Sequence, residues 1–182
     1  MQKIRFIGSV IGSIMLLSSL VALNLQQADA QTPQPQSKLV GAKCVSSGQG
    51  SARKNQEDIS IGKAVYTSEF YLGPGNRSAS MTCKIKPDNR PEPIFQTLNI
   101  GFGMRDNDIS SPAIMVRIYL DGREVESTVV APGQQTILPL NVSNASNVAL
   151  EAICTTPNRY CERVYFFTAS LERKPQPKPE KK

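Results

Sequence analysis

The chain has 182 residues, a formal net charge of +6 and no histidine. Without histidine, Ser-His-Asp and Cys-His catalytic arrangements are excluded. The charge belongs to the two ends: residues 1–30 carry two basic side chains and one acidic (+1), and residues 173–182 carry five basic and one acidic (+4). The body between them is therefore left with +1. A body this close to neutral is not typical of nucleic-acid-binding domains, so we expect no nucleic-acid partner.

The first thirty residues have the pattern of a secretory signal peptide. Lys3 and Arg5 precede an uncharged apolar run, Phe6–Leu23, and Ala28-Asp29-Ala30 supplies the small residues of a cleavage site before Gln31. The alternative is an uncleaved anchor, because the apolar run is almost long enough to span a bilayer. No second apolar run follows. We therefore expect a secreted or periplasmic protein with no membrane span after cleavage.

Three segments are predicted after the cleavage site. Residues 31–38 (Q-T-P-Q-P-Q-S-K) form a flexible leader, residues 39–172 a single β-sandwich domain, and residues 173–182 a disordered tail rich in proline and lysine. A domain of this length can bury its own core. The lysines of the tail predict contact with an acidic surface.

Strand-like runs alternate with turns along the domain. Ile114–Leu120 is the clearest, with apolar residues at every second position and an Asp121-Gly122 turn directly after it. Residues 46–58 are predicted as a loop. With no helical pattern, the runs indicate an all-β sandwich or jelly roll of eight to nine strands. The predicted strands are 39–45, 59–71 with a break near Gly62, 79–85, 98–102, 114–120, 125–130, 137–142, 148–154 and 163–171.

Four cysteines in an exported chain suggest two disulfides, with three connectivities open. Cys154 ends one predicted strand and Cys161 precedes the next, with a Pro-Asn turn between them. This hairpin favours the pair Cys154–Cys161, and elimination leaves Cys44–Cys83. A metal site is the weaker alternative, because there is no histidine and no C-x-x-C spacing.

Catalytic and metal chemistry find little support in the sequence. Acidic pairs exist, but a glycosidase needs two carboxylates facing one bond across a defined gap, which no sequence pattern here indicates. The segment Arg105-Asp106-Asn107-Asp108 has oxygen ligands suited to Ca²⁺ but lacks the longer loop of an EF-hand, and a solvated turn is the favoured interpretation. We expect a protein that is not an enzyme and that holds no cofactor.

Many of the aromatic residues fall inside predicted strands, but Tyr160 lies in the hairpin of the second disulfide. Tyr160 follows Arg159 there, so a sugar ring could stack on the tyrosine while the arginine donates to hydroxyls. The alternative is that Tyr160 covers the disulfide, with its ring packed and its hydroxyl in water.

The order of these motifs from Ile59 to Leu171 resembles the NPCBM family of carbohydrate-binding modules. The similar segments are I-S-I-G-K-A-V-Y (59–66), F-Q-T-L-N-I-G-F-G-M-R-D-N-D (95–108), V-R-I-Y-L-D-G (116–122) and L-P-L-N-V-S-N-A-S-N-V-A-L-E-A (138–152). The resemblance implies a galactose-binding-like jelly roll and sugar binding. The family's histidine after its first strand and the tryptophan of its closing strand are absent from this chain.

These observations lead to two functional hypotheses. The first is an exported, non-catalytic module that binds a glycan or polysaccharide through the end loops of the sandwich. The second is a structural or protein-interaction protein of the cell envelope with the same fold and no sugar site. The candidate ligand-binding residues for the first are Arg77, Asp106, Asn107, Asp108, Arg159 and Tyr160.

Overall fold

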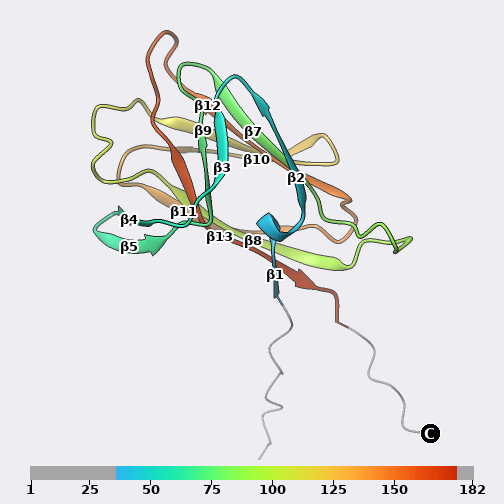
Figure 1. The fold of residues 1–182 in the computed structure, drawn as a ribbon. Coiled ribbons are helices and arrows are strands. Elements are labelled where there is room, and N and C mark those ends of the chain that lie inside the picture. The colour runs from blue at the N-terminus through green and yellow to red at the C-terminus, as the bar shows by residue number, and fades with distance from the viewer. Residues whose placement is uncertain (1–35, 176–182) are drawn as a thin grey trace, which may run out of the picture. The chain divides into compact units, whose positions relative to one another are not determined.

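The computed structural model describes residues 36–175, which form two facing β-sheets and a small hairpin (Figure 1). The predicted signal peptide and most of the predicted tail lie outside these residues. The described residues contain strands and one 3-10 helix, η1 (Leu39–Gly41), and no α-helix. No helix within residues 36–175 is long and apolar enough to cross a membrane.

The first sheet has six strands in the order β11-β8-β13-β6-β3, with β1 on the same side of β13 as β6. Its central pair is long and antiparallel, with Leu171 of β13 opposite Leu98 of β8. The strands are β1 (Gln36–Lys38), β3 (Ser51–Lys54), β6 (Phe70–Gly73), β8 (Phe95–Gly103), β11 (Gln135–Asn141) and β13 (Val164–Arg173).

The second sheet has five antiparallel strands in the order β10-β9-β12-β7-β2. They are β2 (Lys43–Gly48), β7 (Ser78–Lys84), β9 (Ile114–Leu120), β10 (Arg123–Val130) and β12 (Asn147–Cys154). A separate two-stranded hairpin consists of β4 (Asp58–Ile61) and β5 (Ala64–Thr67).

The core lies between the two sheets and follows from the alternation read in the sequence. Ile114, Val116 and Ile118 of β9 are all fully buried, and the residues between them are only partly covered. From the opposite sheet, the rings of Phe70 and Phe166 stack with centroids 4.4 Å apart. Side chains at every second strand position thus fill the space between the layers.

The β4–β5 hairpin builds a second, smaller core on the outer face of the six-stranded sheet. Tyr71 and Tyr165 alternate with core residues of β6 and β13, so their rings point out of the sandwich. Ile59 and Ile61 of the hairpin pack against them and are themselves buried. The hairpin therefore belongs to the domain although it pairs with neither large sheet.

The structure corrects several predicted elements. Residues 39–41 form η1 rather than a strand, and the predicted loop at 46–58 contains the end of β2 and all of β3. The predicted strand at 59–71 is divided into β4, β5 and the start of β6, and residues 36–175 contain thirteen strands in place of the expected eight to nine. The described domain begins at Gln36, because β1 pairs with Glu172 of β13, whereas the leader was predicted to run to residue 38.

Both predicted disulfides, Cys44–Cys83 and Cys154–Cys161, are confirmed. Cys44 and Cys83 are opposite each other in the ladder between β2 and β7, so the bond fastens the edge strand β2 to its sheet. The other bond closes the loop between β12 and β13. No free cysteine remains among residues 36–175.

Candidate functional site

Three connections meet at one end of the sandwich: the turn between β6 and β7 (residues 74–77), the loop between β8 and β9 (104–113) and the disulfide loop between β12 and β13 (155–163). The disulfide loop is fixed at both ends on the turn. The amide of Cys161 donates to the carbonyl of Gly75 at 2.7 Å, and the amide of Cys154 donates to the carbonyl of Arg77 at 2.9 Å. The loop therefore has a defined position relative to this turn.

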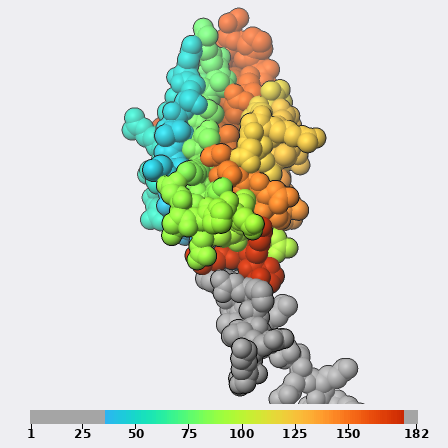
Figure 2. All heavy atoms as spheres, turned by 90° about the vertical axis from the view of Figure 1, so that its right-hand side faces the viewer, coloured from blue at the N-terminus to red at the C-terminus, as the bar shows by residue number. Residues whose placement is uncertain are grey.

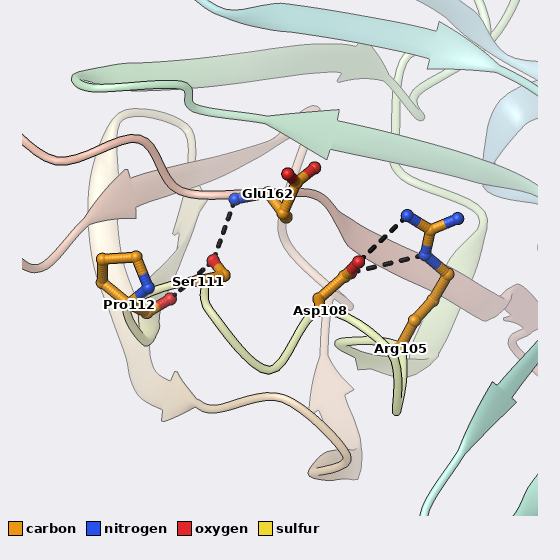
Figure 3. Close-up of polar contacts among 5 residues, drawn as sticks. All are labelled: Arg105, Asp108, Ser111, Pro112 and Glu162. Atoms are coloured by element: carbon orange, nitrogen blue, oxygen red, sulfur yellow. Dashed lines mark hydrogen bonds and ion pairs between the residues drawn. The ribbon is translucent and has the colours of Figure 1, made fainter.

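The disulfide loop is also tied to the β8–β9 loop. The hydroxyl of Thr155 donates to the carbonyl of Ala113 at 2.6 Å, and the guanidinium of Arg159 donates to the carbonyl of Ser110 at 3.2 Å. Figure 3 shows a further contact, from the amide of Glu162 to the hydroxyl of Ser111 at 2.9 Å. Backbone groups that would otherwise be unpaired are thus satisfied by loop-to-loop contacts, which makes the three connections one unit.

Tyr160 is the exposed aromatic group of this unit, with 68% of its surface accessible. Its ring lies beside Gly75, since a Cβ atom built on that glycine would be 3.7 Å from Cε2 of the ring. Gly75 has a φ of +61°, a backbone conformation that favours glycine. A large aromatic side chain with so much exposed surface is available for stacking against a ligand.

Asp108 faces the protein rather than solvent. It is 5% exposed, and its Oδ1 accepts a hydrogen bond at 3.0 Å from Nη2 of Arg105, as Figure 3 shows. The guanidinium of Arg105 also lies 5.1 Å from the centre of the Tyr165 ring. Burial opposes the charge on Arg105, but the hydrogen bond to Asp108 and the nearby charges of Asp108, Tyr165 and Glu57 together outweigh burial and raise the pKa of the guanidinium. The pair anchors the start of the β8–β9 loop on the small outer core.

Asp106 binds the turn of the β4–β5 hairpin. Its carboxylate accepts hydrogen bonds from the hydroxyl of Ser60 at 2.5 Å, from the amide of Gly62 at 2.7 Å and from the amide of Lys63 at 3.0 Å. These donors, led by Ser60, favour the charged form and lower the pKa of Asp106. The carboxylate acts as a cap for a turn in which Lys63 has a φ of +65°.

The six predicted residues thus fall into two groups. Arg77, Arg159 and Tyr160 lie on the turn and the disulfide loop that touch each other, and all three are exposed. Asn107 is exposed on the neighbouring loop. Asp106 and Asp108 lie on that loop too, with their carboxylates engaged by protein donors.

Sequence reasoning did not find the residues that position these groups. Arg105, Ser110, Ser111 and Glu162 fix the loops, and Ser60 reaches Asp106 from 46 positions earlier in the chain. Of these contacts, the one between Arg105 and Asp108 has a signal in the sequence, because the two residues are three positions apart within the candidate cation segment 105–108. Contacts between separate loops leave no periodic pattern in a sequence.

The described residues do not support a calcium loop at 105–108. Asp106 points to the hairpin and Asp108 to Arg105, so their carboxylates do not converge. Within residues 36–175 there is no group of three or more cysteine, aspartate or glutamate side chains placed to hold a metal ion.

Several solved structures of carbohydrate-binding modules have a fold similar to that of this chain. A CBM51 module with its INT domain from Clostridium perfringens ZmpB, in complex with GlcNAc, has a TM-score of 0.61 at 14% identity over 76% of this chain and 32% of that one. A CBM51 module from C. perfringens GH95, in complex with methyl-galactose, has a TM-score of 0.60 at 11% identity over 75% of this chain and 99% of that one.

A third similar structure is the tandem CBM51 pair of the family 98 glycoside hydrolase Sp3GH98 from Streptococcus pneumoniae, with a TM-score of 0.51 at 14% identity over 76% of this chain and 50% of that one. The chain thus spans about a third of the ZmpB structure and half of the Sp3GH98 one. At these identities the likeness establishes the galactose-binding-like sandwich fold alone. No protein-family model matches the chain, and no curated protein matches its sequence.

Proposed function

We propose that this domain is an exported, non-catalytic binding module that recognises a glycan or polysaccharide through the end of the sandwich that carries Tyr160. The observation that carries the proposal is an exposed tyrosine ring on a loop that is closed by a disulfide and bonded to two other connections. A loop whose backbone is already held in place loses little conformational freedom on binding, which favours affinity.

The neighbouring side chains suit a sugar. Arg77 and Arg159 offer donors for hydroxyl groups, and Asn107 offers both a donor and an acceptor on the adjacent loop. In this proposal Asp106 and Asp108 act by shaping the loop that presents Asn107. A shallow site of this kind orients its ligand by a few polar groups around one apolar surface.

The fold comparisons and the cysteines support the remaining parts of the proposal. The similar CBM51 modules were solved with GlcNAc and with methyl-galactose, both of them uncharged sugars, which favours a neutral sugar as the ligand here. The resemblance of the sequence to the NPCBM family also supports a carbohydrate-binding module. Two formed disulfides are typical of an oxidising compartment and support export of the chain.

The test is a panel of glycans and polysaccharides measured at two salt concentrations against the chain beginning at Gln31. We expect salt-insensitive binding to one sugar class. Tyr160→Ala should weaken that binding by about fivefold or more, because it removes the stacking surface, whereas Tyr160→Phe keeps the ring and should bind nearly as well. Equal affinity of the alanine variant would remove Tyr160 from the site.

A complete absence of sugar binding would contradict the proposal. It would favour the second hypothesis, a structural or protein-interaction role in the cell envelope.

A further inference from the structure

A groove of about 440 Å³ lies at the other end of the sandwich from Tyr160. Strands β7, β8 and β13 each run between the two ends: β7 begins beside the disulfide loop and ends at Lys84, while β8 begins at Phe95, on the groove, and ends at the β8–β9 loop. The apolar lining of the groove consists of Ala42 and Pro87, which are partly exposed, over Ile85, Phe95 and Leu171, which belong to the main core and are almost fully buried. The groove is therefore separate from the proposed sugar site.

Lysines surround the apolar lining. Lys38 comes from β1, Lys84 from the end of β7, and Lys86 from the β7–β8 segment. Figure 2 shows that segment, in light green, standing out from the lower part of this face above the end of β13 in red. Three cationic side chains from two sheets thus surround one apolar depression.

A fourth lysine, Lys43, lies close to Lys84 and repels it. Lys43 of β2 is directly opposite Lys84 in the ladder, and like charges at such positions destabilise a sheet. Asp88 pairs with Lys84, and that contact together with the charge of nearby Lys43 lowers the pKa of its carboxyl. An unfavourable pair of like charges in a sheet is expected more often at a functional site than elsewhere.

The four lysines at the groove have fewer carboxylate partners than positive charges. Lys38 pairs with Glu69 at 3.1 Å and Lys84 with Asp88, but among residues 36–175 no carboxylate lies within 4 Å of the ammonium groups of Lys43 and Lys86. The groove therefore has surplus positive charge beside an apolar surface, although the body as a whole is almost neutral.

We propose that this groove binds a carboxylated polysaccharide, with sugar rings against the apolar lining and uronate carboxylates paired with Lys84, Lys86 and their neighbours. The CH faces of sugar rings can pack against Ala42 and Pro87, and the carboxylates of a uronate polymer can pair with the lysines of the groove. Ammonium groups on flexible stems can adjust to carboxylates at varied positions. The second site would let one domain hold an acidic polymer at one end and a neutral sugar at the other.

The experiment measures binding of sodium polygalacturonate and of its methyl ester to the full mature chain. Esterification removes the negative charge and keeps the sugar backbone. We expect binding of the acid form only, weakened by salt because the pairs are exposed. The double variant Lys84→Gln/Lys86→Gln should bind about fivefold less tightly, as two exposed ion pairs are lost.

Three controls make the result specific. Arg53→Gln/Lys63→Gln removes the same charge from exposed positions away from the groove and should leave affinity unchanged. A chain that ends at Pro175 lacks the last lysines and should still bind. Tyr160→Ala should also bind normally, so failure of the sugar site and failure of the groove are distinguishable.

Several results would overturn the proposal. One is equal weakening by both double variants, which would indicate general charge attraction. Another is loss of binding only in the chain that ends at Pro175, which would assign binding to the tail. Equal binding of dextran sulfate or a single-stranded oligonucleotide would remove the preference for carboxylated sugars, and no binding of polygalacturonate would remove the site.

Discussion

The carboxylate of Asp106 accepts a hydrogen bond at 2.5 Å from the hydroxyl of Ser60, so a loop at the end of β8 holds the turn of the β4–β5 hairpin. Two amides of the same turn, Gly62 and Lys63, donate to the same carboxylate. The position of the hairpin over Tyr71 and Tyr165 is thus fixed from outside the hairpin, because its own two short strands are marginal in isolation.

Asp106→Asn should loosen the hairpin without unfolding the sandwich. The amide keeps one acceptor oxygen in place of two and loses the charge, so the three donors are no longer all satisfied. We expect faster amide hydrogen exchange at Gly62 and Lys63, measured by NMR or mass spectrometry, with little change in the core strands. Asp58→Asn is the matched control, since Asp58 accepts only from the hydroxyl of Thr67 at 2.8 Å. Unchanged amide hydrogen exchange in the Asp106 variant would show that the packing of Ile59 and Ile61 is enough to hold the hairpin.

Asp121 should make stability depend on pH in the acid range. Burial raises the pKa of Asp121, but hydrogen bonds from the backbone amides of Ser146 and Asn147 and from the Asn147 side chain together outweigh burial and lower the pKa below the ordinary value of an aspartate. A carboxyl with a depressed folded pKa contributes stability above about pH 4, and this contribution is lost as pH falls through the folded pKa. Asn tolerates the φ of +48° found here. Asp121→Asn should therefore lower the melting temperature at pH 6 and flatten its decline between pH 5 and pH 2. Parallel melting curves for both proteins across that range would contradict this.

The two disulfides should differ in what their loss changes. In the chain-entropy model, removing Cys44–Cys83, separated by 39 residues, costs about 4 kcal/mol, and removing Cys154–Cys161, separated by 7, costs about 2.5 kcal/mol. Sugar binding should follow the opposite order, because only the second bond closes the loop that carries Tyr160. Paired Cys→Ser variants measured by denaturant unfolding and by glycan binding test both statements. Equal loss of sugar binding in the two variants would separate Tyr160 from the site.

Gly103→Ala should be strongly destabilising. A Cβ atom there would lie 2.5 Å from the carbonyl oxygen of Gln134 and 3.0 Å from Cα of Gln135, so β8 and β11 would have to move apart. Overpacking of this kind costs about 1–3 kcal/mol. Gly41→Ala is the control, because nothing lies within 4 Å of its Cβ position and its φ is not positive. Denaturant unfolding should show a large loss for the first and almost none for the second.

The period-two pattern in the sequence predicted most of the long strands correctly, and the hairpin before Cys161 together with elimination predicted both disulfides. Ile114–Leu120 has the predicted limits, because alternation over seven residues with a turn after it leaves one arrangement that buries the apolar face. The prediction failed for much of residues 39–73, where η1 and the four-residue strands β3, β4, β5 and β6 are too short to show a period.

For the candidate site too, some features could be predicted from the sequence and others depend on the fold. The sequence by itself determined an all-β domain, the closed loop that carries Arg159 and Tyr160, and the absence of histidine chemistry, since these depend on residue type and local spacing. Only the tertiary structure decided that Gly75 lies beside Tyr160, that Asp106 and Asp108 turn to Ser60 and Arg105, and that Lys84 faces Lys43. The physical reason is that these relationships arise where strands distant in the sequence are brought together by burial of the common core, and hydrogen bonds between their loops form only after that packing is in place.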